Sequence, residues 1–379
     1  MMAKPAKKAA LTKLTIKGFK SIESLVDFEL RPLNVLIGAN GAGKSNFVEF
    51  FRMLRAMAWE GLQSYIQEAG GADGFFFGGP KQTKQISSRL QFGDVAYEFI
   101  LSATAEGKLS VGKEALRVPG LNVSFIAKLR AAESSLRPAA LGERMDFSPE
   151  SEDRGIYESV HTLLESCVAY HVHDTTDLAP MRRPQPVYDN EYLRGDAANV
   201  AAFLLRLRRR YRKAYDRIRD TVRLVAPFFD DFVLKVEAFG PEEKVSLAWR
   251  QKGNDFTFQS HHLSDGTIRF IGLVTALLQP DPPATMLIDE PELGLHPYAI
   301  SILGSLIQSA AEKTQVIVTT QSPGLLEQFE PEDIVIVRRE QGRSVFERLD
   351  AKALGEWLDE YSVAELWEKN VLRAGPTHG

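Results

Sequence analysis

The sequence contains a single cysteine, Cys167, among its 379 residues. One cysteine excludes an internal disulfide and fits a reducing compartment, so we expect a cytoplasmic protein. The longest apolar run, Phe270–Leu278, is far shorter than the ~20 residues of a membrane span, so no membrane partner is expected. Met1–Ala10 contains lysines but no apolar stretch, which indicates a short mobile basic tail rather than a secretory signal.

An excess of positive charge is also missing. The 46 lysines and arginines are outnumbered by 50 acidic residues, which gives a net charge of −4. A protein that coats nucleic acid is usually basic overall, so any contact with nucleic acid would need a local patch. The 44% apolar and 25% charged residues are typical of a globular protein, and the length predicts two or three domains, or one large domain with an insertion.

Strand patterns occupy both ends of the sequence, and a different segment separates them. Residues 11–37 predict two strands, a turn and the short strand Val35–Ile37, after which a helix runs to about Ala58. Alternating apolar residues predict an antiparallel meander up to residue 118, and strands and helices alternate from 240 to about 338. The final segment predicts a strand, Val345–Leu349, and an amphipathic helix around Trp357–Trp367.

A phosphate-binding pattern follows the strand Val35–Ile37. The residues from Gly38 to Ser45 read GANGAGKS, which fits G-x-x-x-x-G-K-S between an apolar strand and a helix. Glycines let backbone N–H groups cradle phosphate oxygens, and the helix N-terminus adds partial positive charge. The alternative is a chance glycine-rich turn. The pattern predicts ATP contacts by Gly38, Asn40, Gly41, Ala42, Gly43, Lys44, Ser45 and Asn46, with Lys44 on the β/γ-phosphates and Ser45 on Mg²⁺.

Two carboxylates end a second apolar strand, Thr285–Asp289. We predict that Asp289 holds Mg²⁺ and that the adjacent Glu290 orients or deprotonates the attacking water. The alternative is a pair of solvated acids in a turn. The next strand, Val316–Thr320, ends at Gln321, and parallel strands would bring both ends to one edge of the sheet. Together with the loop, this pattern predicts a nucleoside triphosphatase.

A third motif defines the kind of ATPase. Leu263–Thr267 reads LSDGT, with Arg269 behind it, and resembles the signature motif of ABC-type ATPases in the RecF/SMC/OLD-like group. The segments TIKGFKSIES, PLNVLIGANGAGKSN and DEPELGLHP resemble the same group. The C-terminal Tyr361–Trp367 resembles a narrower set of stand-alone AAA-family ATP-binding proteins without a nuclease domain. A chance turn before a helix is the alternative interpretation of LSDGT.

The resemblance implies a head-to-tail homodimer around two ATP molecules. The signature residues Ser264, Asp265 and Gly266 would then cover the γ-phosphate bound by the partner's loop, and Gly294–His296 would cross the interface. It also implies a phosphate contact for Lys20, just after the first strand.

Two departures from the group concern the rate of hydrolysis. Asp265 stands where transporter ATPases have glycine, and Gln321 stands where most ABC-type ATPases have a histidine. Glutamine can donate a hydrogen bond to the γ-phosphate but cannot become cationic, so we predict a slow ATPase with Gln321 as a catalytic residue.

The Q-loop residue has no distinct signal. The strand Val168–Val172 leading to His173 is the candidate. His171 and His173 share one face of that strand, and they are open to three interpretations: metal ligands, neighbours of the nucleotide edge, or structural side chains.

One helix, predicted from about Ala198 to Ala226, combines a heptad-like apolar seam with basic residues on its other faces. Over 204–223 it could be a solvated helix whose arginine stems cover apolar surface, a contact for the nucleic-acid backbone, or a dock for an acidic partner. The candidate contact residues are Arg208, Arg209, Arg210, Arg212 and Lys213.

The predicted fold class is α/β: a P-loop ABC-type ATPase head with a mixed sheet, an antiparallel meander subdomain and a helical insertion. The head comprises 11–118 and 240–340, the insertion 119–239, and the segment 341–379 packs on the head. The predicted function is an ATP- and Mg²⁺-dependent dimerisation switch that acts on nucleic acid, in DNA repair or phage defence with a separate effector chain. The alternative is a protein-assembly scaffold for a toxin or nuclease without direct DNA binding.

Overall fold

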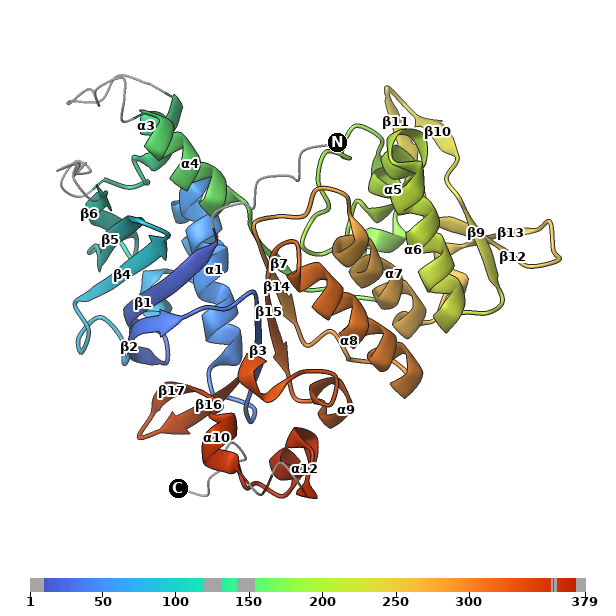
Figure 1. Ribbon diagram of the computed structural model, residues 1–379. Coiled ribbons are helices and arrows are strands. Elements are labelled where there is room, and N and C mark those ends of the chain that lie inside the picture. The colour runs from blue at the N-terminus through green and yellow to red at the C-terminus, as the bar shows by residue number, and fades with distance from the viewer. Residues whose placement is uncertain (1–9, 119–130, 142–153, 356, 358–359, 373–379) are drawn as a thin grey trace, which may run out of the picture.

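The computed structural model describes residues 10–118, 131–141, 154–355, 357 and 360–372. The basic tail expected before residue 10 therefore lies outside the described residues. A six-stranded mixed sheet forms the centre of the molecule (Figure 1). In spatial order its strands are β17 (Arg343–Arg348), β16 (Ile334–Glu340), β3 (Leu33–Ile37), β15 (Gln315–Thr320), β14 (Thr285–Asp289) and β7 (Cys167–Tyr170). All neighbours are parallel except the β16–β17 pair.

The predicted meander is confirmed, and the first two strands join it in one antiparallel sheet. Its order is β2 (Ile22–Glu29), β1 (Leu11–Phe19), β4 (Gln85–Phe92), β5 (Val95–Ala103) and β6 (Leu109–Arg117). This sheet stands against the central one with helix α1 (Lys44–Ala58) between them (Figure 1). The α1 stripe of Phe47, Phe50, Phe51 and Leu54 is buried there, as its helical spacing predicts.

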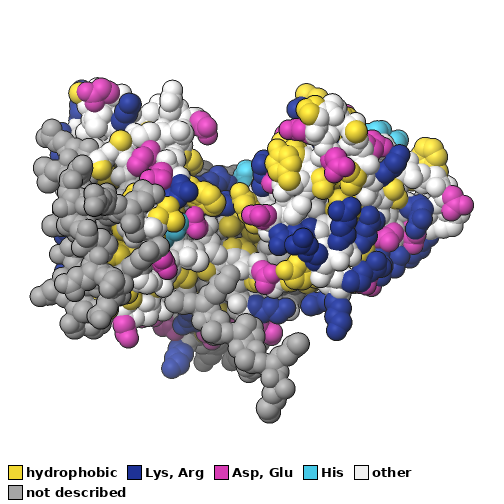
Figure 2. Space-filling model, turned by 90° about the horizontal axis from the view of Figure 1, so that it is seen from above, with side chains coloured by type: hydrophobic (Ala, Val, Ile, Leu, Met, Phe, Trp, Pro, Cys, Tyr) yellow, Lys and Arg dark blue, Asp and Glu magenta, His cyan; other side chains and the backbone are white. Residues whose placement is uncertain are grey.

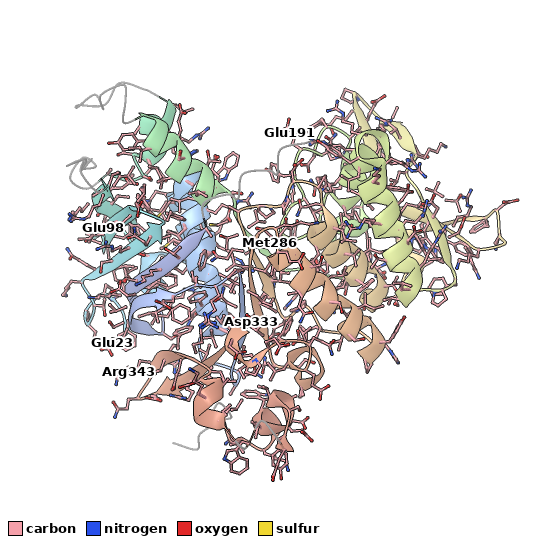
Figure 3. All side chains as sticks on the ribbon, in the orientation of Figure 1. Glu23, Glu98, Glu191, Met286, Asp333 and Arg343 are labelled. Carbon is pink, nitrogen blue, oxygen red and sulfur yellow. The ribbon has the colours of Figure 1, made fainter. Side chains whose placement is uncertain are left out.

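Alternate residues of the central strands face two different hydrophobic cores, as the period of two requires. Leu36, Leu287 and Ile317 pack with α1, whereas Val35 and Met286 pack on the opposite side. Figure 3 labels Met286 near the middle of the molecule. The opposite side is covered by α7 (Asp265–Leu278) and α8 (Pro297–Ala311) (Figure 1). Because both faces are covered, the central strands are continuous apolar runs.

The remaining elements surround this framework. On the side of α1 lie α2 (Leu62–Glu68), α3 (Leu136–Leu141) and α4 (Arg154–Glu165). Beyond α7 lie α5 (Val200–Arg210), α6 (Arg212–Val225), and two small sheets built from β8 (Gln185–Pro186), β9 (Phe229–Val233), β10 (Val236–Phe239), β11 (Glu242–Val245), β12 (Ala248–Gln251) and β13 (Thr257–Gln259). The C-terminal part adds α9 (Pro323–Leu326), α10 (Ala351–Leu354) and α12 (Val363–Glu368).

The prediction of a single long helix from Ala198 to Ala226 is wrong. The chain leaves helical geometry at Tyr211, with φ −133° and ψ 53°, so α5 and α6 are two helices. Their apolar positions, including Leu204 and Ile218, are buried in the core beside α7. The apolar positions predicted as a heptad-like seam therefore form a stripe that faces the core. Over so short a segment, a heptad spacing and a 3.6-residue helical period are hard to distinguish.

The expected boundaries of the insertion also require correction. Strand β7 falls inside 119–239, yet it pairs in parallel with β14 at the edge of the central sheet. The segment therefore contributes a strand to the head. The sequence predicted a strand at Val168–Val172, but its partner β14 lies far away in the sequence, so the pairing could not be assigned. At the opposite edge, β17 joins the sheet and Arg343 forms an ion pair of 3.2 Å with Glu23 of β2; both are labelled in Figure 3.

A buried carboxylate in the antiparallel sheet generates a pH-dependence test. Burial raises the pKa of Glu114, although Tyr97 and Ser134 donate hydrogen bonds to it. The folded protein thus binds this proton more tightly than the unfolded chain, so the contribution of Glu114 to stability is lost as pH rises above the unfolded pKa.

We expect Glu114→Gln to gain stability relative to the wild type between about pH 5 and about pH 8, by roughly 1 kcal/mol for each unit by which the pKa is raised. Urea denaturation at both pH values measures the difference. Parallel pH dependences of the two proteins would contradict the prediction.

Candidate functional site

The loop between β3 and α1 has the geometry that phosphate binding requires. Gly41 and Gly43 adopt φ values of 76° and 116°, which side chains rarely tolerate, and a Cβ at Gly38 would overlap the Val337 carbonyl oxygen. Lys44 Nζ donates to the carbonyl oxygens of Gly38 at 2.5 Å and Ala39 at 3.2 Å. Only 5% of Lys44 is exposed, and burial lowers its pKa against the opposing charges of Glu290, Asp289 and Glu292. The ammonium group is thus held over the loop.

The back of the loop is fixed by residues far away in the sequence. Ser344 Oγ of β17 donates to the Ala42 carbonyl oxygen at 2.5 Å and lies 2.7 Å from Ser21 Oγ. Asn46 Nδ2 donates to the same Ser21 hydroxyl at 2.6 Å. Asn46, expected among the nucleotide contacts, is engaged in holding the loop in this structure. Sequence analysis missed both serines: Ser344 belongs to no motif, and Ser21 lies in TIKGFKSIES without being singled out there.

The surroundings of Asp289, at the end of β14, favour the ionised form of its carboxyl group. Its Oδ1 accepts a hydrogen bond from Thr319 Oγ1, and its Oδ2 accepts one from His171 Nδ1 at 3.1 Å. Burial raises the pKa of this carboxyl, but the hydrogen bonds outweigh burial and the net pKa is lowered. The Ser45 hydroxyl is exposed at the start of α1. An ionised carboxylate and a free hydroxyl are oxygen ligands that Mg²⁺ prefers, so these residues fit that ion.

Glu290 and Gln321 meet directly at the ends of neighbouring strands. Glu290 has φ 43°, and its N–H donates to the Thr319 carbonyl oxygen at 3.0 Å. Gln321 Nε2 donates to Glu290 Oε1 at 2.6 Å. The parallel pairing of β14 with β15 creates this contact, as the strand alternation predicted. The amide therefore orients the carboxylate that we predicted to act on water.

A third acid, Glu292, was missed by sequence analysis. Its Oε1 accepts hydrogen bonds from Thr320 Oγ1 at 2.6 Å and from the Gln321 N–H at 3.1 Å. Its Oε2 is buried and has no hydrogen-bond partner among the residues that the structure describes. Burial raises the pKa of this carboxyl. Glu292 holds the backbone beside Gln321, and its place in DEPELGLHP was the available signal.

The two histidines after β7 lie at the same edge. Their rings stack with centroids 3.7 Å apart, and His173 Nε2 donates to the backbone oxygen of Asp289 at 3.1 Å. Burial and the neighbouring His171 lower the pKa of His173. No group of three or more metal-ligating side chains occurs in the described ranges. Of the three interpretations, contact with the predicted nucleotide edge fits these distances.

The signature motif begins α7 and is tied to the turn after β14. Ser264 caps the helix by accepting from the Thr267 N–H at 3.2 Å, and Asp265 forms an ion pair of 3.0 Å with Arg182. A Cβ at Gly266 would overlap the Gly294 carbonyl oxygen, so this close packing requires glycine. In the described part of the chain, no hydrogen bond or ion pair links Ser264, Asp265 or Gly266 to the phosphate loop.

Arg269 joins three parts of the site. Its guanidinium donates to the backbone oxygens of Val172 at 2.7 Å, His173 at 3.1 Å and Leu293. The side chain is buried and burial lowers its pKa. One residue of the signature helix therefore holds the end of β7 and the turn that follows Asp289 and Glu290.

Lys20 is engaged within the chain. Its ammonium lies 2.7 Å from Glu49 of α1 and 4.9 Å from the centre of the Phe75 ring. It is the residue before Ser21, which supports the loop. A phosphate contact by Lys20 remains a prediction.

The basic residues of α5 and α6 divide into paired and unpaired groups. Arg208 donates to the Leu234 carbonyl oxygen at 3.2 Å, and Arg212 pairs with Asp216 at 3.1 Å. Within the described residues, no hydrogen bond or ion pair engages Arg209, Arg210 or Lys213, and all three are exposed. Figure 2 shows many Lys and Arg side chains on the half of the molecule opposite the grey-covered side. None of the described helices is long and apolar enough to cross a bilayer.

Comparisons with known proteins agree with this architecture. Two solved SMC head structures are similar to the chain. One, the SMC head bound to the C-terminal winged-helix domain of ScpA, has a TM-score of 0.58 and 16% identity, and the match covers 92% of this chain and 99% of that one. The other is a Pyrococcus furiosus SMC head with an extended coiled coil, bound to the C-terminal domain of ScpA. It has a TM-score of 0.59 and 15% identity, and the match covers 93% of this chain and 99% of that one. At these identities the likeness shows the fold.

A comparison with curated protein sequences finds no match. A family model described as "AAA domain, putative AbiEii toxin, Type IV TA system" matches residues 33–327, which is more than half of the chain. This match includes the phosphate loop, the signature motif, Asp289 and Gln321. The chain therefore belongs to this AAA-domain family, and its fold is similar to that of SMC head domains.

Proposed function

We propose that the protein is a slow, Mg²⁺-dependent ATPase that dimerises around ATP and acts on nucleic acid together with a separate effector chain. The observation that carries the proposal is the convergence of Lys44, Asp289 and Glu290 at the carboxyl edge of the central sheet. Lys44 supplies positive charge for the β- and γ-phosphates, and Ser45 and Asp289 would hold Mg²⁺. When bound, the ion neutralises charge on the phosphates.

The chemical step assigned to the chain's own residues is the activation of water. Glu290 accepts a proton from the water that attacks the γ-phosphate, and Gln321 keeps the carboxylate oriented through its 2.6 Å hydrogen bond. The same amide can donate to the γ-phosphate, but it carries no positive charge. Because a neutral donor stabilises the developing charge less than a cation does, turnover is slow.

The position of the signature supports the proposed dimerisation. The motif LSDGT caps α7 and has no hydrogen bond or ion pair to the phosphate loop in the described part of the same chain. A second copy, placed head to tail, would bring its Ser264 and helix N-terminus to the γ-phosphate. Arg269 then connects the signature to the strand ends that carry Asp289 and His173, so ATP binding and dimer contacts would be coupled.

The effector and nucleic-acid parts of the proposal rest on two further observations. The similar SMC heads are bound to ScpA, so heads of this fold accommodate a separate chain. The exposed Arg209, Arg210 and Lys213 form a local basic patch on a chain that is acidic overall. The second candidate, a protein-assembly scaffold without DNA binding, is supported by the ion pairs that occupy Arg212, Arg219 and Arg223.

Glu290→Gln tests the ATP-linked dimer. The substitution keeps the shape of the side chain but removes the base, so we expect the ATP-bound dimer to accumulate and the mass to double only with ATP and Mg²⁺. Light scattering measures the mass. Glu312→Gln, an exposed acid after α8, is the matched control and should behave as the wild type. A mass that ATP leaves unchanged in every variant would overturn the switch.

Gln321→Ala tests the orienting amide. We expect wild-type turnover below about 1 s⁻¹, and a further fall of about tenfold in the variant with ATP affinity within about threefold of the wild type. Steady-state phosphate release and ATP titration measure the two quantities. Gln308→Ala removes an exposed amide of α8 and serves as the control. Turnover well above the expected limit would contradict the assignment of a slow switch.

Replacement of Arg209, Arg210 and Lys213 by glutamine tests the nucleic-acid contact. We expect DNA affinity to fall and the slope of log affinity against log salt to shrink by about one unit for each lost phosphate contact. The control replaces by glutamine Lys81 and Lys84, which are exposed before β4, and Arg89, which is exposed on β4. If the wild type shows no salt-dependent DNA binding, the scaffold function replaces the nucleic-acid function.

A further inference from the structure

A cavity lies beside the edge strand β7, away from the phosphate loop. Its volume is about 530 Å³, which is in the range of small-molecule sites. One wall is the second half of α1, the floor is one face of β7, and the other wall is the loop 192–196 before α5. Seen from above in Figure 2, the molecule is hollowed between its two halves, and basic, histidine and hydrophobic side chains lie at the bottom of that hollow.

Two arginines of α1, Arg52 and Arg55, line this cavity. Within the described residues, neither guanidinium group has a hydrogen bond or an ion pair, and Arg55 Nε is buried without a hydrogen-bond partner. The Tyr192 ring lies 5.8 Å from the Arg55 guanidinium. The acid in the lining, Asp196, already accepts the Ala198 N–H at 3.0 Å. Since a buried donor without an acceptor is unfavourable, an anion in the cavity would satisfy a group that the protein leaves open.

Aromatic side chains stand at the same cavity. Trp59 follows α1 and Tyr192 precedes α5, and about half of each side chain is exposed although both line the cavity. Exposed aromatic rings beside cationic groups suit a ligand that combines a flat ring with a negatively charged group. The ligand's ring stacks on an aromatic side chain while the arginines hold the charged group. A nucleoside phosphate combines these two features.

The cavity is distinct from the ATP site. Arg52 and Arg55 lie eight and eleven residues after Lys44 on the same helix, which places them about 12 and 16 Å along its axis. The lining residues Cys167, Ala169 and His171 alternate along β7 and face the cavity together. None of the residues that line it belongs to the phosphate loop or the signature.

We propose that this cavity is a second binding site, which takes a nucleoside monophosphate or the 5′-phosphorylated end of a nucleic acid. The phosphate is held by Arg52 and Arg55, and the base stacks against Trp59 or Tyr192. The local backbone is built for close packing, since a Cβ at Gly195 would overlap the Ala169 carbonyl oxygen and the His171 N–H donates to the Gly195 oxygen at 2.8 Å.

The site is coupled to ATP through His171, a part of the proposal that rests on the proposed function. His171 lines the cavity, and its Nδ1 donates to Asp289 Oδ2 at 3.1 Å. A ligand that contacts the other side of this ring changes the position of a hydrogen bond to the predicted Mg²⁺ ligand. Coupling between sites is reciprocal, so the ligand alters ATP affinity as much as ATP alters that of the ligand.

The experiment titrates the full-length Lys44→Ala protein with AMP, UMP, inorganic phosphate, and one oligonucleotide in 5′-phosphate and 5′-hydroxyl forms, by calorimetry. Lys44→Ala weakens the ATP site, so the remaining binding reports on the cavity. We expect saturable 1:1 binding that Arg55→Gln weakens about tenfold or more and Arg117→Gln, an exposed arginine of β6, leaves unchanged. Tyr192→Ala, at an exposed ring, tests stacking, and melting temperatures verify folding.

The outcomes separate the sources of the ligand. Tighter binding of AMP or UMP than of the oligonucleotides indicates a free nucleotide, whereas tighter binding of the 5′-phosphorylated oligonucleotide than of its 5′-hydroxyl form indicates a nucleic-acid end. The absence of saturation up to about 10 mM for every probe, or equal affinity in Arg55→Gln, overturns the site.

Coupling is measured on the protein with an intact phosphate loop, as the change in ATP affinity on addition of AMP. The measurement is made at AMP concentrations that saturate each protein, and we expect about a fivefold change in the wild type that His171→Gln abolishes. An unchanged ATP affinity overturns the coupling alone. A protein that binds AMP in the cavity but never ATP would overturn the proposed function and leave the second site standing.

Discussion

The Asp289 carboxylate is the group around which the site is assembled. It is buried at the end of β14, yet hydrogen bonds from Thr319 and His171 lower its pKa, so its charge is retained. Thr319 belongs to β15 and His171 directly follows β7, and these are the two strands that flank β14. The order of strands in the central sheet therefore decides whether this carboxylate can serve a cation.

The same edge is made rigid by contacts across the fold. Arg269 of α7 holds the backbone after β7 and the turn after β14, and Ser344 of β17 holds the phosphate loop. The phosphate loop, the turn after β14 and the signature helix are thus held by side chains that donate hydrogen bonds to backbone oxygens. A shift of the signature helix would be transmitted to the strand ends, which is the mechanical requirement of an ATP-dependent switch.

Two of the buried side-chain atoms without a hydrogen-bond partner lie beside the two proposed sites. Glu292 Oε2 lies at the predicted ATP site and Arg55 Nε lies at the cavity beside β7, and neither has a partner among the described residues. Most buried polar groups in proteins are hydrogen-bonded. The Glu292 oxygen would accept a hydrogen bond and the Arg55 nitrogen would donate one, so the two proposed sites each contain an unsatisfied group of the opposite kind. His171 touches both regions through its place on the edge strand.

Local patterns in the sequence determined the elements and the chemistry. The glycine-rich loop, the strand before Asp289 and Glu290, and the antiparallel meander each rest on neighbouring residues, and their elements lie where the patterns predicted. Tertiary structure decided the rest. The pairing of β7 with β14, the break at Tyr211, and the support of the loop by Ser344 were decided in this way, and they leave no periodic signal because each involves a single residue or a short strand. The sequence alone predicted the ATP chemistry, whereas only the packing of α1 against β7 created the second cavity.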